Sequence, residues 1–118
     1  MFAPYEPYIP KGRGETLDKL GSMMLGSPRF EDDSGYFPGK NIDTEFYALN
    51  EALKLMRKRL GEETYLRLAS LSDRMRAHFD ADPNYDNGET EKGSKIILEM
   101  MDILRGKTSV SRAGQPEL

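Results

Sequence analysis

Apolar residues recur at alternating steps of three and four along much of the chain, and this periodicity is the feature that most constrains the fold. Side chains three and four positions apart lie on one face of an α-helix, so each such stripe predicts a helix with one buried face. The spacing predicts helices over 43–60, 62–79 and 88–105, and a shorter helix from Thr16 to Leu25. The stripes consist of Leu17, Leu20 and Met24; Phe46, Leu49, Leu53, Met56 and Leu60; Tyr65, Leu68, Leu71, Met75 and Phe79; and Ile96, Ile97, Met100, Met101 and Leu104.

Residues typical of helix ends lie at the boundaries of these segments. We expect Thr16 and Asp43 to act as N-caps, because their side-chain oxygens can accept a hydrogen bond from the first turn. Gly61 is placed to end one helix, and the turn after it is so short that the two central helices should form an antiparallel hairpin. Asp86 is expected to cap the last helix, with Glu89 completing a capping box. The predicted fold is therefore all-α, a small helical bundle built around a central α-hairpin.

The 118 residues suit a single domain with three parts. Residues 1–14 contain three prolines and two glycines between aromatic side chains, which indicates an extended arm. Residues 15–106 should form the helical core. The polar segment 107–118 is predicted to be a mobile tail.

Composition excludes several classes of protein. The chain has no cysteine, so disulfides, thiolate catalysis and cysteine-based zinc sites are excluded, and a reducing cytosol suits it. We find neither a basic, apolar leader at the N-terminus nor an apolar run long enough to span a membrane, and we therefore predict a cytoplasmic protein. The single histidine, His78, has no serine placed to complete a catalytic triad with it. We predict no catalytic residue, no cofactor and no metal ion, and so a protein that binds a partner.

Two stretches concentrate the negative charge and supply the predicted partner-binding residues. The first contains five acidic residues against one base, and its candidate residues are Glu31, Asp32, Asp33 and Tyr36. The second contains five acidic residues and no base, and its candidates are Asp80, Asp82, Tyr85, Asp86, Glu89 and Glu91. Both Asp82 and Asp86 are expected to be exposed. Acidic surface of this kind attracts a basic partner, and an aromatic side chain beside it can anchor the contact. Nucleic acid is disfavoured as the partner, because the net charge is −3.

The segment 80–91 has part of the pattern of a calcium-binding loop. Oxygen-bearing side chains occupy positions one, three and five, and Glu91 occupies position twelve. Tyr85, however, stands where the loop needs glycine for a sharp turn, and Pro83 stiffens the approach. The pattern therefore favours solvated acids beside a helix cap over a calcium site.

The region 61–104 also contains several short motifs that point to a family. These are Thr64-Tyr65-Leu66, Ser72-Asp73, the run from His78 to Pro83, the run from Gly88 to Gly93, and Ile97-Leu98-Glu99. In them the chain resembles small helical immunity proteins that accompany the toxins of contact-dependent growth inhibition and related bacterial competition systems. The resemblance implies an immunity protein that binds one cognate toxin domain, often a nuclease, and neutralises it in a stoichiometric complex. It implies no catalytic residues.

Two other functions remain open at this level. A regulatory or adaptor domain that binds a host protein, with a degenerate calcium loop at 80–91, would present the same acidic surface. An enzyme would need chemistry based on carboxylates alone, which no motif in the chain supports.

Overall fold

The computed structural model describes residues 5–32 and 34–107, and five helices lie within them. They are α1 (Gly12–Gly26), α2 (Ile42–Leu55), α3 (Arg57–Leu60), α4 (Glu62–Asp80) and α5 (Glu89–Leu104). The described residues contain no strand, which confirms the all-α prediction. In the predicted tail, residues 108–118 lie outside the described residues, as do residues 1–4 of the predicted arm.

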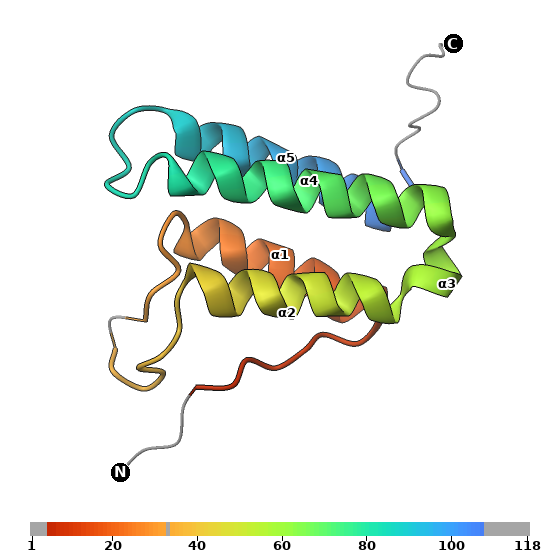
Figure 1. Cartoon of the computed structure of the whole chain (residues 1–118), viewed down its shortest axis with the longest axis horizontal. Coiled ribbons are helices and arrows are strands. Elements are labelled where there is room, and N and C mark those ends of the chain that lie inside the picture. The colour runs from red at the N-terminus through yellow and green to blue at the C-terminus, as the bar shows by residue number, and fades with distance from the viewer. Residues whose placement is uncertain (1–4, 33, 108–118) are drawn as a thin grey trace.

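The four long helices run alternately in opposite directions (Figure 1). Each packs against its neighbour in the chain, and α1 also packs against α5, which closes the bundle. The connection between α1 and α2 and the connection between α4 and α5 therefore lie at the same end of the bundle, while α3 crosses the opposite end (Figure 1). This topology places two segments that are about fifty residues apart in sequence beside one another.

The buried apolar side chains form one continuous cluster, which the predicted stripes supply almost entirely. Most stripe residues are buried, whereas Leu17, Met24, Leu60 and Met101 are partly buried and pack against the cluster. Met23 is buried although the predicted stripe of the first helix omitted it. Phe30, from the connection after α1, also enters the core and meets the rings of Phe46 and Phe79 edge-on.

The first helix begins earlier than the sequence predicts. It starts at Gly12, and Thr16 lies inside it with its hydroxyl donating to the Gly12 carbonyl oxygen at 2.8 Å, so the predicted cap is wrong. Arg13 reaches across the bundle and donates to the carbonyl oxygen of Leu104 at 2.5 Å. The first turn of α1 contains Gly12 and Gly14, which are poor helix formers. The hydrogen bond from Arg13 to α5 links this turn to the rest of the bundle.

The predicted helix over 43–60 is two helices. The chain bends at Met56, where the backbone leaves the helical region, and α3 carries it over the end of the bundle. Arg57 stabilises this corner, because its guanidinium lies 4.3 Å from the centre of the Tyr65 ring and donates to Glu62 at 2.8 Å. The cap of α2 is Asn41, which forms a capping box with Thr44, so the predicted cap at Asp43 is wrong.

The helices α4 and α5 form the most extensive helix pair. Their close approach depends on Gly93, because a Cβ at this position would lie 2.5 Å from a ring carbon of Phe79. The two helices match the predicted ranges 62–79 and 88–105 to within one residue at each end. The left-handed φ of +88° at Gly61 separates α3 from α4, as predicted.

Candidate functional site

The loop between α4 and α5 is organised around the side chain of Asp82. Its carboxylate accepts hydrogen bonds from the backbone N–H groups of Asp86 at 2.7 Å, Asn87 at 3.2 Å and Thr90 at 3.1 Å. The Asp82 residue is 0 % exposed. The last of these contacts places a negative charge at the first turn of α5, where the helix dipole favours it.

The titration of Asp82 reflects two opposing causes. Burial raises the pKa of the carboxyl group, and the backbone hydrogen bonds from Asp86, Thr90 and Asn87 lower it. The hydrogen bonds prevail, and the net pKa lies below its usual range. Asp82 is therefore held as a carboxylate inside the protein.

This arrangement overturns two predictions about the loop. Asp82 was expected to be exposed and is buried, so it cannot contact a partner directly. The predicted capping box of Asp86 and Glu89 is also absent from this loop, because Asp82 serves the first turn and the Asn87 side chain accepts the Glu89 N–H at 3.0 Å. The turn places Tyr85 at a left-handed φ of +55°.

The other acidic residues of the loop divide into paired and free groups. Asp80 accepts from Arg76 at 3.3 Å, and Glu89 lies between His78 at 2.7 Å and Lys92 at 2.9 Å. The contacts with Arg76 and Lys92 join neighbouring positions of one helix, whereas the contact between His78 and Glu89 links the end of α4 to the start of α5.

Two acidic residues, Asp86 in the loop and Glu91 in the first turn of α5, lack an ion pair. Both are exposed, and neither forms an ion pair within the described part of the chain. Tyr85 is 60 % exposed, and the Glu91 carboxylate beside its hydroxyl raises the pKa of the phenol. The loop and the first turn of α5 thus present one aromatic ring and two carboxylates without an ion pair to solvent.

The connection between α1 and α2 has a comparable construction. The Asp32 carboxylate accepts from the Ser34 hydroxyl at 2.8 Å and from the Phe37 N–H at 2.8 Å, and these bonds lower the pKa of Asp32. Glu31 is exposed, and Tyr36 is 82 % exposed. Asp33 lies outside the described residues.

Both loops lie at the same end of the bundle, as the alternating helix directions require (Figure 1). Side chains of the two segments line one small cavity, with Glu31 from the first and Asp80 from the second. We call this region the acidic end. It comprises Glu31, Asp32, Tyr36, Asp80, Tyr85, Asp86, Glu89 and Glu91, with Asp82 inside it as the residue that orders the second loop.

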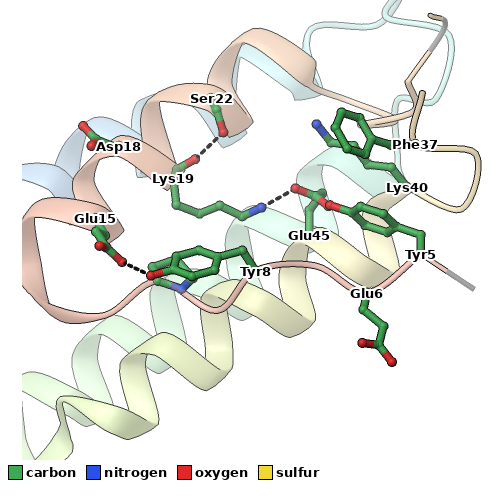
Figure 2. A pocket seen from close by; sticks show the side chains of 11 residues that line it. Tyr5, Glu6, Tyr8, Glu15, Asp18, Lys19, Ser22, Phe37, Lys40 and Glu45 are labelled. Carbon is green, nitrogen blue, oxygen red and sulfur yellow. Dashed lines mark hydrogen bonds and ion pairs between the residues drawn. The ribbon is translucent and has the colours of Figure 1, made fainter. Parts of the chain in front are cut away.

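The sequence predictions missed a larger cavity of about 550 Å³ beside the N-terminal segment. Figure 2 shows Tyr5 and Tyr8 from that segment, Lys19 from α1, and Phe37 and Lys40 from the α1–α2 connection around it. Its volume falls within the range of ~300–1,000 Å³ that is usual for ligand sites. No motif marks it, because its walls come from segments far apart in the chain.

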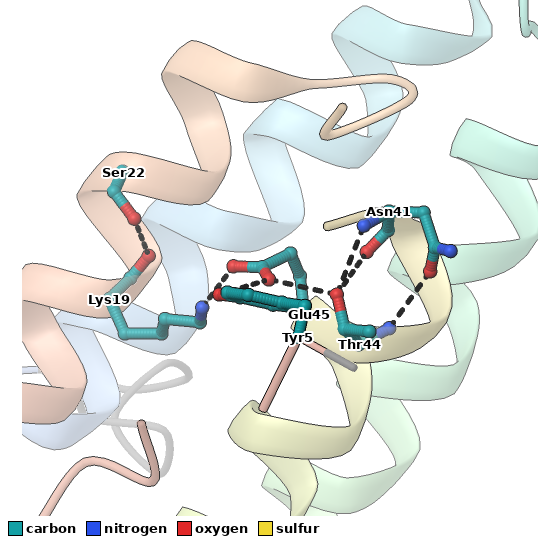
Figure 3. A network of polar contacts seen from close by, with 6 residues as sticks. All are labelled: Tyr5, Lys19, Ser22, Asn41, Thr44 and Glu45. Atoms are coloured by element: carbon teal, nitrogen blue, oxygen red, sulfur yellow. Dashed lines mark hydrogen bonds and ion pairs between the residues drawn. The ribbon is translucent and has the colours of Figure 1, made fainter. Parts of the chain in front are cut away.

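The floor of this cavity is a network of polar groups around Glu45 (Figure 3). The carboxylate pairs with Lys19 and accepts from the Tyr5 hydroxyl at 3.3 Å and the Thr44 hydroxyl at 3.0 Å. Burial, together with the nearby Glu45 charge, raises the pKa of Tyr5 to about 12. The one sequence signal was the position of Glu45, four residues before Leu49 and therefore beside the apolar stripe.

At the acidic end and in the network around Glu45, polar groups form hydrogen bonds within their own region. Within the described ranges, no three histidine, cysteine or acidic side chains come together in a way that could hold a metal ion. No helix among the described residues is both long and apolar enough to cross a membrane. Comparison of the chain with protein-family models, with curated proteins and with solved structures finds no match.

Proposed function

We propose that this chain is an immunity protein that binds and neutralises a cognate bacterial toxin, with the acidic end as the contact surface. The observation that carries the proposal is the meeting of two acidic stretches at one end of the bundle, each with an exposed tyrosine. Many nucleases have basic substrate clefts, and this surface complements such a cleft in charge. The family resemblance within 61–104 points to the same role.

The construction of the two loops supports tight binding. Asp82 and Asp32 each accept several hydrogen bonds from their own loop, so the exposed side chains are held on an ordered backbone. A surface that is ordered before binding loses less conformational entropy on association. Tyr36 and Tyr85 are the candidate anchors, because exposed aromatic residues often dominate the energy of an interface.

Co-expression tests the proposal directly. Cells producing the C-terminal domain encoded by the neighbouring open reading frame should survive only when this chain is present. The double variant Asp86→Lys and Glu91→Lys should slow association at low salt, because it reverses charge on the approach side. Asp73→Lys reverses one charge at an exposed position in the middle of α4, away from the acidic end, and serves as the control for each single variant, Asp86→Lys or Glu91→Lys; it should protect like the wild type.

Substitution of an exposed tyrosine tests whether the acidic end is the contact surface, and does not test the immunity role itself. Tyr85→Ala should raise the dissociation rate, at a cost of ~2 kcal/mol or more, because the ring is lost from the complex and not from the encounter. If the toxin kills cells with and without this chain, the immunity role is wrong and the adaptor function takes its place. If the loop variants protect as well as the wild type, another surface binds the toxin.

A further inference from the structure

A cavity of about 130 Å³ lies at the acidic end, between the α1–α2 connection with the start of α2 and the end of α4 with Pro83 of the following loop. Its lining is mostly apolar and includes Pro28, Ile42, Phe79 and Pro83, while Glu31 and Asp80 contribute carboxylates and Arg29 and Asn41 contribute a guanidinium and an amide. Phe79 is 1 % exposed and belongs to the core, so it lies at the floor. Glu31 and Asp80 are exposed, so they lie at the rim.

The size of the cavity limits what it can hold. It is well below the ~300–1,000 Å³ of sites that bind a whole small molecule, and it is many times the ~10–15 Å³ that one water centre needs. A single side chain of a partner is the occupant of that scale. Interfaces concentrate their energy in such contacts, in which one side chain fills one pocket.

The chemistry of the walls selects the type of side chain. A mostly apolar cavity with carboxylates at its rim suits a residue with an apolar stem and a cationic head. Glu31 comes from the α1–α2 connection and Asp80 from the last position of α4, so a head group with several donors is needed to reach both. The guanidinium of arginine has five donors in a planar fork and pairs with carboxylates through two bonds at once, whereas lysine is a point charge.

Two basic residues of the chain itself affect this site. Arg76 donates to one oxygen of Asp80, Oδ2, at 3.3 Å, which fixes the carboxylate without occupying both of its oxygens. Arg29 lines the cavity and is exposed, so its charge opposes the entry of another cation. Removal of the Arg29 charge should therefore strengthen binding at this cavity.

From these observations we propose that this cavity at the acidic end receives an arginine side chain of the partner, with its stem on Phe79 and Ile42 and its guanidinium between Glu31 and Asp80. This inference deepens the proposed function and rests on it. It names the residue type that the toxin presents at the centre of the contact.

A titration that needs no toxin tests the cavity by itself. The probe is N-acetyl-arginine amide, added to the isotope-labelled full chain and followed by amide chemical shifts. We expect the largest shifts at Ile42, Phe79 and Glu31. N-acetyl-citrulline amide has nearly the same shape without the charge and should cause no shifts there. Equal shifts with the two probes, or arginine-specific shifts at Asp86 and Glu91 alone, would overturn the proposal.

Variants separate this cavity from general attraction by the acidic end. Glu31→Gln should weaken binding of the arginine probe by about two- to five-fold, in the range of exposed ion pairs, and Arg29→Gln should strengthen it by about two-fold. Glu91→Gln removes the same charge outside the cavity and should leave the affinity unchanged. If Glu91→Gln weakens binding as much as Glu31→Gln, the cavity is not the site.

A lysine probe and the toxin experiment complete the test. Equal affinity for N-acetyl-lysine amide would overturn the choice of arginine. Arginine binding in the cavity with no protection from any toxin would refute the proposed function and leave the cavity site standing. Protection without arginine binding would refute only the cavity. The two failures are therefore distinguishable.

Discussion

Two buried carboxylates, Asp82 and Glu45, are stabilised in different ways. Asp82 accepts from backbone N–H groups, all within eight residues of it. Glu45 binds the side chains of Lys19 and Tyr5, which are 26 and 40 residues away. The first carboxylate thus depends on the conformation of one loop, and the second depends on three segments packing together. The comparison shows that equal burial does not imply equal dependence on the rest of the fold.

The largest effect is expected from Asp82→Ala, which leaves three backbone donors without an acceptor. Unsatisfied buried donors are costly, and we expect the melting temperature to fall by roughly 15 °C or more. Thermal unfolding followed by circular dichroism measures this. Asp86→Ala, at an exposed position in the same loop, is the control and should change the melting temperature by less than about 3 °C. Equal effects of the two variants would show that Asp82 does not order the loop.

At the Glu45 site, a single substitution should lower the free energy of unfolding more than a double substitution that removes both charges. Glu45→Gln leaves the Lys19 ammonium without its charged partner in a largely buried position, at a cost of about 3 kcal/mol. The double variant Lys19→Met and Glu45→Leu replaces the pair by apolar groups and should lie within about 1 kcal/mol of the wild type. Denaturant unfolding measures both values. A double variant as unstable as the single one would mean that the charges, and not the packing, hold this region.

The stability that Asp82 contributes should decrease at low pH, and this effect should be smaller than those of the substitutions above. The pKa of Asp82 is lowered in the folded state, so its contribution is fully present above its usual pKa of about 4 and is lost as the pH falls further. The stability difference between wild type and Asp82→Asn should therefore shrink from pH 6 toward about pH 3, as measured by urea unfolding. A difference that stays constant with pH would contradict the assigned ionisation.

High pH should reveal the Glu45 site through Tyr5. Its pKa is raised to about 12 in the folded state, so its contribution is fully present below the usual pKa of about 10 and is lost as the pH rises toward 12. Tyr5→Phe should remove this part of the alkaline loss and change stability only modestly at neutral pH. Urea unfolding between pH 8 and pH 11 provides the measurement. Identical profiles for the two proteins would show that Tyr5 is not held beside Glu45.

The parts of the fold that could be predicted are those encoded by local periodicity. The stripes of α4 and α5 identify their buried faces, because a helix repeats its contacts every three or four residues. The bend at Met56 was missed because the apolar spacing continues through it. The early start of α1 was missed because Gly12 disfavours helix and its neighbour Arg13 contacts α5, which is distant in sequence.

The same distinction applies to the candidate site. The order of residues identifies the acidic stretches and the tyrosines within them, and the structure shows that Tyr36 and Tyr85 are exposed. It does not reveal that Asp82 turns inward, because a capping side chain that lies several residues outside its helix has no fixed spacing. The Lys19–Glu45 pair and the cavity above it depend on tertiary packing, and neither follows from any local pattern.

The alternating order of the helices also has a consequence for how the chain folds. The contacts among the described helices join neighbours in the chain, or α2 and α4 across the short α3, and the contact of α1 with α5 alone joins the first helix to the last. Local contacts form with a small loss of loop entropy, so the transition state should contain the α4–α5 pair, with α1 joining later. Substitutions at Leu20 of α1 should then mainly speed unfolding, while substitutions at Ile97 of α5 should mainly slow folding.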